Sequence, residues 1–419
     1  MKHSNTFKKE LTKFCYIPFH GFCIDPQGWL TMCCMDPRGT AVIKKKNKLQ
    51  NFPRVYKKPH IDDVEDLQEW WVETYEEVWQ KYFDNEQHSI TPCMKCFNKD
   101  YTYITSKKKT VKESYDSNLK GGKIKWEFDF IDPKVRWLEF TVSNICNQMC
   151  VMCSGRCSTK WLDFDEMFGH SKMELQKLST SAMDKIKKLI PDLSVLVVKG
   201  GEPLADMANM KLLEYAAEVN PDIDIKMTTN LQGLTKNHIK ILKKFKELTL
   251  NVSVDGTHDI YNWIRGGDFN KAVNNMKTLY EETGHKVATG TAVSIYNFFN
   301  LKDILDFFHD KDYVRWMHYY NIVNWPEWCS IFHVPDSILR PYLNKYQYYE
   351  FKYPRSNGGN LATITGQTNK DITLLAEKYT RQMNSIRKSD ILDYVPELKK
   401  LFNYWYCNCC SFKHIFCLS

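Results

Sequence analysis

The chain has 419 residues and a mass of 49.5 kDa, enough for two or three domains with sizeable cores. Its composition, 43% hydrophobic and 26% charged, is typical of soluble globular proteins and excludes wholesale disorder. No apolar run reaches membrane-spanning length, and residues 1–11 are polar and lysine-bearing, without the apolar core of a signal peptide. We therefore expect no membrane association and a cytoplasmic location.

The net charge of +8 is modest for this length. Lysine runs at 44–46 and 107–109 would attract nucleic acid only if other recognition features accompanied them, and no aromatic-interleaved motif does. The runs are therefore interpreted as solvated loops, and nucleic acid is not an expected partner.

Residues 1–105 form the first predicted unit. The turn residues Asp25-Pro26-Gln27-Gly28 predict two short strands around them. A helix is expected over 62–83, where apolar residues recur every three or four positions along one face. Residues 106–133, rich in Lys, Ser, Asp and Gly, are predicted to be a linker.

From residue 135 a strand–helix alternation continues for six rounds, which predicts parallel strands with right-handed crossovers. The expected strands are 137–143, 194–199, 224–229, 249–254, 286–295 and 315–323, and the expected helices are 181–190, 207–219, 236–246, 269–283 and 300–310. Six units predict an α/β fold, a partial (βα)6 TIM barrel over 134–335. Residues 336–419 are expected to be a helical C-terminal region, with helices at 371–383 and 396–404.

Three of the fifteen cysteines follow the first predicted barrel strand with the spacing C-x3-C-x2-C: Cys146, Cys150 and Cys153. Without a secretion signal, clustered cysteines indicate metal or redox chemistry in preference to disulfides. Three thiolates can each hold one iron of a four-iron cluster and leave the fourth iron open, but thiolates suit zinc equally well.

A second cysteine pattern lies upstream of the barrel. Cys15, Cys33 and the pair Cys93-x2-Cys96 can supply four ligands to one metal centre, with Cys34 as the competitor of Cys33. The assignment of a third, C-terminal group stays open: Cys407, Cys409, Cys410 and Cys417.

The tetrapeptide Gly200-Gly201-Glu202-Pro203 ends the second predicted barrel strand. Its glycines allow a ligand to approach the backbone, and its carboxylate can accept from an ammonium group. Together with the C-x3-C-x2-C loop, it resembles the signature of the radical S-adenosylmethionine (SAM) enzymes. The resemblance implies a [4Fe–4S] cluster on the three cysteines, with SAM bound at the open iron.

The resemblance also implies roles for individual residues. Gly200, Gly201 and Glu202 would bind the amino group of SAM, and three polar residues would reach its ribose and carboxylate: Asn230, Ser253 and Arg265. Met152 occupies a position that is often aromatic in the family, where an apolar side chain still shields the cluster.

The upstream cysteines resemble the twitch unit, a shortened SPASM domain that holds an auxiliary [4Fe–4S] cluster in radical SAM proteins. In the best-known members this unit follows the barrel, whereas here it precedes it. The resemblance thus implies a small, cysteine-rich α+β twitch-like domain over 1–105, with Cys15, Cys33, Cys93 and Cys96 as ligands. Zinc at these thiols stays an alternative.

The expected function is that of a radical SAM enzyme supplied with electrons by a donor such as flavodoxin or ferredoxin. Reductive cleavage of SAM would give a 5′-deoxyadenosyl radical that abstracts hydrogen from a substrate carbon, in a peptide or protein, while the auxiliary cluster takes up an electron. One alternative is a radical SAM dehydrogenase of a small polyol or aminocyclitol. Another class is a non-catalytic zinc-binding structural or nucleic-acid-binding protein.

Overall fold

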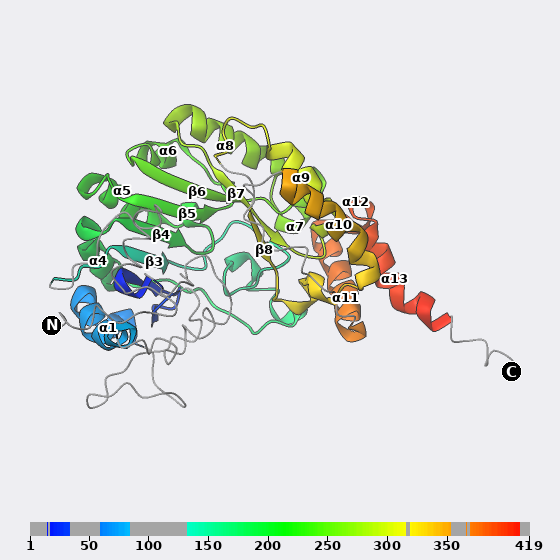
Figure 1. Ribbon diagram of the computed structural model, residues 1–419, viewed down its shortest axis with the longest axis horizontal. Coiled ribbons are helices and arrows are strands. Elements are labelled where there is room, and N and C mark those ends of the chain that lie inside the picture. Colours follow the sequence, from blue (N-terminus) through cyan, green and yellow to red (C-terminus); the bar gives the residue numbers. More distant parts are fainter. Residues whose placement is uncertain are drawn as a thin grey trace.

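A computed structural model describes residues 15, 17–33, 59–83, 132–315, 319–352, 366 and 369–410. Its centre is an eight-stranded sheet with the order β2-β1-β3-β4-β5-β6-β7-β8 (Figure 1). All neighbouring strands are parallel except the antiparallel pair β1–β2. The strands are β1 (Gly21–Ile24), β2 (Leu30–Thr31), β3 (Trp137–Thr141), β4 (Val195–Lys199), β5 (Asp224–Thr229), β6 (Glu247–Ser253), β7 (Ala288–Val293) and β8 (Tyr319–Ile322).

Helices cover one face of this sheet, as the predicted crossovers require (Figure 1). Each strand from β3 to β7 is followed by at least one of them: α4 (Thr180–Leu189), α5 (Met207–Val219), α6 (Lys236–Leu242), α7 (His258–Arg265), α8 (Phe269–Thr283) and α9 (Leu301–Phe308). Side-chain caps start several of them; Ser179, Asp206 and Asp268 each accept a hydrogen bond from a backbone N–H in the first turn. The predicted α/β fold with a parallel sheet is confirmed.

The burial pattern shows which face of the sheet is left for chemistry. In β3, Leu138 and Phe140 are buried, while Trp137, Glu139 and Thr141 are half-buried on the opposite face. Successive side chains of a strand point to opposite faces, so the helix-covered face is apolar and the inner face is open and more polar. The inner face therefore offers room for a ligand.

The described part of the N-terminal unit belongs to this same sheet. Strand β1 runs parallel to β3, and helix α1 (Leu67–Phe83) buries its predicted apolar face in the common hydrophobic core. Gln68 donates to the carbonyl of Pro133 (2.8 Å) and accepts from the N–H of Val135 (2.9 Å). The expected boundary at residue 134 therefore runs between strands of one sheet. Cys34, Cys93, Cys96 and most of the expected linker lie outside the described residues.

The C-terminal region is helical, as expected, and packs beside β8 and α7 (Figure 1). It contains α10 (Asp336–Lys352), α11 (Lys370–Arg387), α12 (Ile391–Tyr394) and α13 (Glu397–Cys410). Hydrogen bonds fix α11 to the barrel: Trp263 Nε1 donates to Asn384 Oδ1 (2.9 Å), and Tyr296 pairs with Thr380 (2.8 Å). Cys407, Cys409 and Cys410 lie in α13, but their side chains are outside the described set, as is Cys417.

Short 3₁₀ helices complete the described part: Ile17–Phe19, Ile61–Asp63, Thr159–Trp161, Glu166–Phe168, Ile190–Asp192, Pro203–Ala205, Phe298–Asn300, Glu327–Cys329 and Ile331–His333. Among the described helices, none combines the length and the apolar character needed to cross a lipid bilayer.

Candidate active site at the carboxyl ends of the strands

A pocket of about 460 Å³ opens at the carboxyl ends of β4 to β8. Catalytic and binding residues of parallel barrels gather at this end of the strands. The six polar and glycine residues predicted to contact a cofactor all line this pocket: Gly200, Gly201, Glu202, Asn230, Ser253 and Arg265. The other lining residues are Lys199, Thr228, Thr229, Asn251, Asp255, Gly290, Thr291, Ala292, Tyr320 and Asn321.

The three motif cysteines lie on the loop that follows β3, residues 142–158, called the thiol loop below, and each is half-buried. Burial, and next the neighbouring Cys150 thiol, raise the pKa of Cys146 to about 12. The Cys146 sulfur lies 3.5 Å from the N–H of Gln148 and 4.0 Å from Asn230 Nδ2, a pocket residue. The thiol loop therefore borders the pocket directly.

A buried asparagine holds the thiol loop in shape. Asn144 is fully buried, and its amide nitrogen donates to the carbonyls of Gly155 (2.7 Å) and Glu174 (2.9 Å). Its amide oxygen accepts from the N–H of Gln176 (2.9 Å). A buried side chain satisfied on both ends fixes the backbone that it bridges, so both ends of the loop are pinned to the segment that follows it.

The glycine pair connects the thiol loop to the pocket through the backbone. The N–H of Gly201 donates to the carbonyl of Ser143 (3.1 Å), and that of Glu202 donates to the carbonyl of Ile145 (2.8 Å). A Cβ at Gly201 would lie 2.2 Å from the oxygen of Ile145, so only glycine permits this approach. The glycine predicted to admit a ligand also admits the neighbouring loop.

The carboxylate of Glu202 is buried and accepts three hydrogen bonds. The donors are the N–H of Leu204 (3.1 Å), the hydroxyl of Thr229 (2.6 Å) and the N–H of Asn230 (2.6 Å). Burial raises the pKa of Glu202, and these hydrogen bonds oppose the increase. Two carboxylate oxygens can accept about four hydrogen bonds, so one further donor can be accommodated.

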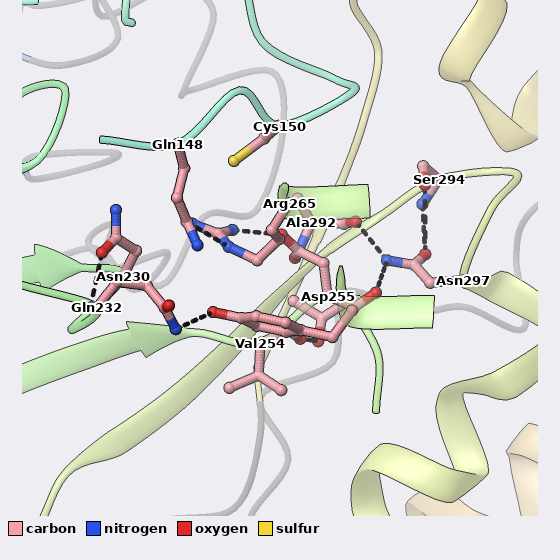
Figure 2. Close-up of polar contacts among 12 residues, drawn as sticks. Gln148, Cys150, Asn230, Gln232, Val254, Asp255, Arg265, Ala292, Ser294 and Asn297 are labelled. Atoms are coloured by element: carbon pink, nitrogen blue, oxygen red, sulfur yellow. Dashed lines mark hydrogen bonds and ion pairs between the residues drawn. The ribbon is translucent and has the colours of Figure 1, made fainter. Parts of the chain in front are cut away.

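Arg265, at the end of α7, is held by two partners (Figure 2). Its Nη1 donates to Asp255 Oδ2 (2.5 Å), and its Nε donates to Gln148 Oε1 (3.1 Å). Burial disfavours the charged guanidinium, but the neighbouring Cys150 and Asp255 raise the pKa of Arg265 well above its ordinary value. Asp255 in turn accepts from the N–H of Ala292 (2.7 Å). A fixed cation thus lies between the thiol loop and the pocket.

Two members of this network were not expected from the sequence. Asp255 follows β6 directly, where an Asp-Gly pair also fits an ordinary turn, and Gln148 lies between the motif cysteines with no pattern of its own. The strand-end position of Asp255 was the one signal available. Cys157, outside the motif, shares a hydrogen bond with Cys153 that lowers the pKa of the Cys157 thiol to about 7.

The donor set fits a thiolate-bound cluster. Burial raises the pKa of the Cys150 thiol as well, so a metal entering the loop must displace protons. Within the described ranges, no three His, Cys, Asp or Glu side chains converge as ligands of one metal ion. A four-iron cluster takes each thiolate at a separate iron. Met152 is half-buried and packs against the core beside Cys153.

The predicted auxiliary site is described only at two of its residues. Cys15 and Cys33 are half-buried, Cys15 just before the 3₁₀ helix Ile17–Phe19 and Cys33 just after β2. Their expected partners Cys93 and Cys96 fall on residues outside the described ranges. The auxiliary centre therefore stays a prediction.

Residues 140–310 match the sequence model of the Radical SAM superfamily. GTP 3′,8-cyclase of Campylobacter lari is 27% identical over 127 residues, which cover 29% of this chain and 35% of the relative. GTP 3′,8-cyclase of Clostridium botulinum is 28% identical over 151 residues, which cover 34% of this chain and 43% of the relative. The matched segments thus span less than half the length of these curated relatives.

Among solved structures, the chain is similar to SuiB of Streptococcus suis bound to S-adenosylmethionine, with a TM-score of 0.39 and 15% identity over 74% of this chain and 65% of that one. It is also similar to anSMEcpe with bound AdoMet and Kp18Cys peptide, with a TM-score of 0.38 and 18% identity over 52% and 62% of the two chains. The sequence match, and not these structural similarities, identifies the domain. The chain therefore carries, over residues 140–310, a domain of the radical SAM enzyme superfamily.

Proposed function

We propose that Cys146, Cys150 and Cys153 hold a [4Fe–4S] cluster and that SAM binds beside it in the pocket. One observation carries the proposal: hydrogen bonds connect the loop with the three thiols to residues of the pocket with the predicted SAM contacts. The backbone of Glu202 bonds to Ile145, and Asn230 Nδ2 donates to Asn147 Oδ1 (2.7 Å). One ligand in the pocket could therefore contact the cluster and the predicted SAM-binding side chains at the same time.

When bound and reduced, the cluster supplies the electron that cleaves SAM and yields the 5′-deoxyadenosyl radical. The chain's residues bind and orient. In this proposal the glycines admit the amino group of SAM near Glu202, whose remaining acceptor capacity suits an ammonium. Ser253, Asn230 and Arg265 face the ribose and carboxylate, and Asp255 holds the Arg265 guanidinium in place. Met152 shields the cluster from solvent.

A peptide or protein is the proposed substrate, as the resemblance to SPASM- and twitch-type enzymes implies. The pocket is consistent with a second candidate, a small polar molecule such as a polyol or aminocyclitol, because Lys199, Asn251 and Asn321 are among the residues that line it. These side chains suit hydroxyl groups better than apolar ones. The matched segments of the GTP 3′,8-cyclases cover under half of those enzymes, so their nucleotide substrate is not carried over.

A second cluster is proposed at Cys15, Cys33, Cys93 and Cys96. Four thiolates would leave no iron open, so this cluster would take up the electron released by the substrate radical instead of binding the substrate. A soluble donor such as flavodoxin or ferredoxin would reduce the first cluster. Zinc in the upstream site is the alternative, since four thiolates also suit tetrahedral zinc.

Iron analysis after anaerobic reconstitution tests both sites. Wild type should bind about eight irons per chain, and the Cys15→Ala/Cys33→Ala double variant about four. Zinc in place of about four of the irons would show that the upstream site is a zinc site. A colourless protein that holds only zinc would refute the proposed function.

A further inference from the structure

Helix α11 of the C-terminal region places one arginine side chain against the thiol loop. Arg387, its last residue, donates from Nε to the carbonyl of Trp263 (2.8 Å) and from Nη2 to the carbonyl of Met149. Met149 directly precedes Cys150, and Trp263 lies in α7, two residues before Arg265. One guanidinium therefore joins the thiol loop, α7 and the C-terminal region.

The position of Arg387 follows from how α11 is docked. Thr380, Asn384 and Arg387 are spaced at helical intervals and all contact the barrel. The end of α7 accommodates the guanidinium through Gly266, which has φ +64° and where a Cβ would lie 2.8 Å from the guanidinium atoms. Arg381 of the same helix is different, because it is largely exposed and pairs with Glu377 one turn away (2.7 Å). Only one of these two arginines is directed into the site.

Arg387 places a positive charge beside Cys150. Its Nη2 donates to the carbonyl of Met149, the residue directly before Cys150, and Arg265 Nε donates to the side chain of Gln148, two residues before it. Two guanidinium groups, one from α7 and one from α11, therefore bond to the segment that carries Cys150. A cation near a cluster stabilises its reduced form, which carries one more negative charge than the oxidised form.

We infer that Arg387 is a positioning residue that fixes the backbone of the thiol loop and, through its charge, raises the reduction potential of the cluster held there. The inference rests on the proposed function, since it assumes a cluster on Cys150. It assigns the C-terminal region a part in electron uptake, in addition to covering the barrel. Hydrogen bonds to two carbonyls on separate segments, made by a fixed and planar donor group, are suited to that positioning.

Three variants separate charge from hydrogen bonding. Arg387→Met removes both, Arg387→Gln keeps a donor without charge, and Arg387→Lys keeps a charge without the planar fork. Arg381→Met is the matched control on the same helix. The cluster's midpoint potential is measured by spectroscopic redox titration without SAM. Amide hydrogen exchange at Val151, whose N–H donates to the carbonyl of Ile264 (2.8 Å), is measured on the iron-free protein.

We expect the potential to become more negative in Arg387→Met and Arg387→Gln, and to stay near wild type in Arg387→Lys and Arg381→Met. Exchange at Val151 should speed up in Arg387→Met and not in Arg381→Met, a result that needs no bound iron. Unchanged potentials in both neutral variants overturn the electrostatic role, and unchanged exchange in Arg387→Met overturns the positioning role. If wild type holds no cluster at all, the proposed function fails instead, and the exchange measurement still decides whether Arg387 positions the loop.

Discussion

Substitution of Gly201 by alanine should separate the pocket from the thiol loop. The new Cβ would lie 2.2 Å from the oxygen of Ile145 and 2.8 Å from that of Asn144, so the backbone must move. Overpacking of this kind costs about 1–3 kcal/mol. The shift also breaks the hydrogen bonds from the N–H groups of Gly201 and Glu202, at about 1 kcal/mol each. The free energy of unfolding should fall by about 3–5 kcal/mol in all.

Denaturant unfolding measures this loss, and equilibrium binding of SAM to the reconstituted protein measures the effect on the site. Gly233→Ala is the matched control, because its Cβ would meet only Asn147 Nδ2, at an ordinary 3.5 Å. We expect Gly233→Ala to retain wild-type stability and SAM binding, and Gly201→Ala to lose both. A Gly201→Ala protein as stable as the control would refute the close approach, and wild-type SAM affinity in it would refute the direct border between the thiol loop and the pocket.

Two further predictions concern buried charges. Asp255→Ala leaves the buried Arg265 guanidinium without its carboxylate and should lower the free energy of unfolding by about 3–5 kcal/mol. The control Asp306→Ala breaks the exposed pair with Lys302 and should lower it by no more than about 1 kcal/mol. Equal losses of the two variants in denaturant unfolding would contradict the stabilising role of the buried pair. Burial, and next the charge of Arg136, lower the pKa of His20 from 6.5 to about 3. Below pH 6.5 His20 therefore binds a proton in the unfolded chain but not in the folded one, so the free energy of unfolding falls as the pH drops. Between pH 7 and pH 5 this amounts to about 2 kcal/mol, which His20→Gln should remove from the pH dependence of unfolding; an unaltered pH dependence would show that His20 is not held neutral.

The strand ends of the barrel were predictable because their signals are local. The near-continuous apolar run at 194–199 predicted β4, and the residues that follow such a run lie at a strand end whatever the details of packing. In a parallel sheet these ends meet at one edge, so strand order along the chain was enough to group Gly201, Asn230 and Ser253 around one pocket, whereas Arg265, at the end of α7, was named from the family resemblance.

The remaining contacts depend on segments far apart in the sequence. Gln148 and Arg265 are 117 positions apart, and Met149 and Arg387 are 238 apart. No periodicity or spacing encodes such a pair, because it arises only when the helices dock. The pairing of β1 with β3 was missed for the same reason, since an N-terminal hairpin with its own turn signal resembles a separate unit.

The central claim is that the loop with Cys146, Cys150 and Cys153 cleaves SAM through a bound cluster. The most direct test is the release of 5′-deoxyadenosine from SAM by the reconstituted protein with a reductant, beside Cys150→Ala prepared in the same way. We predict turnover by wild type and none by the variant. Equal release by both, or no release by an iron-loaded wild type, would contradict the account.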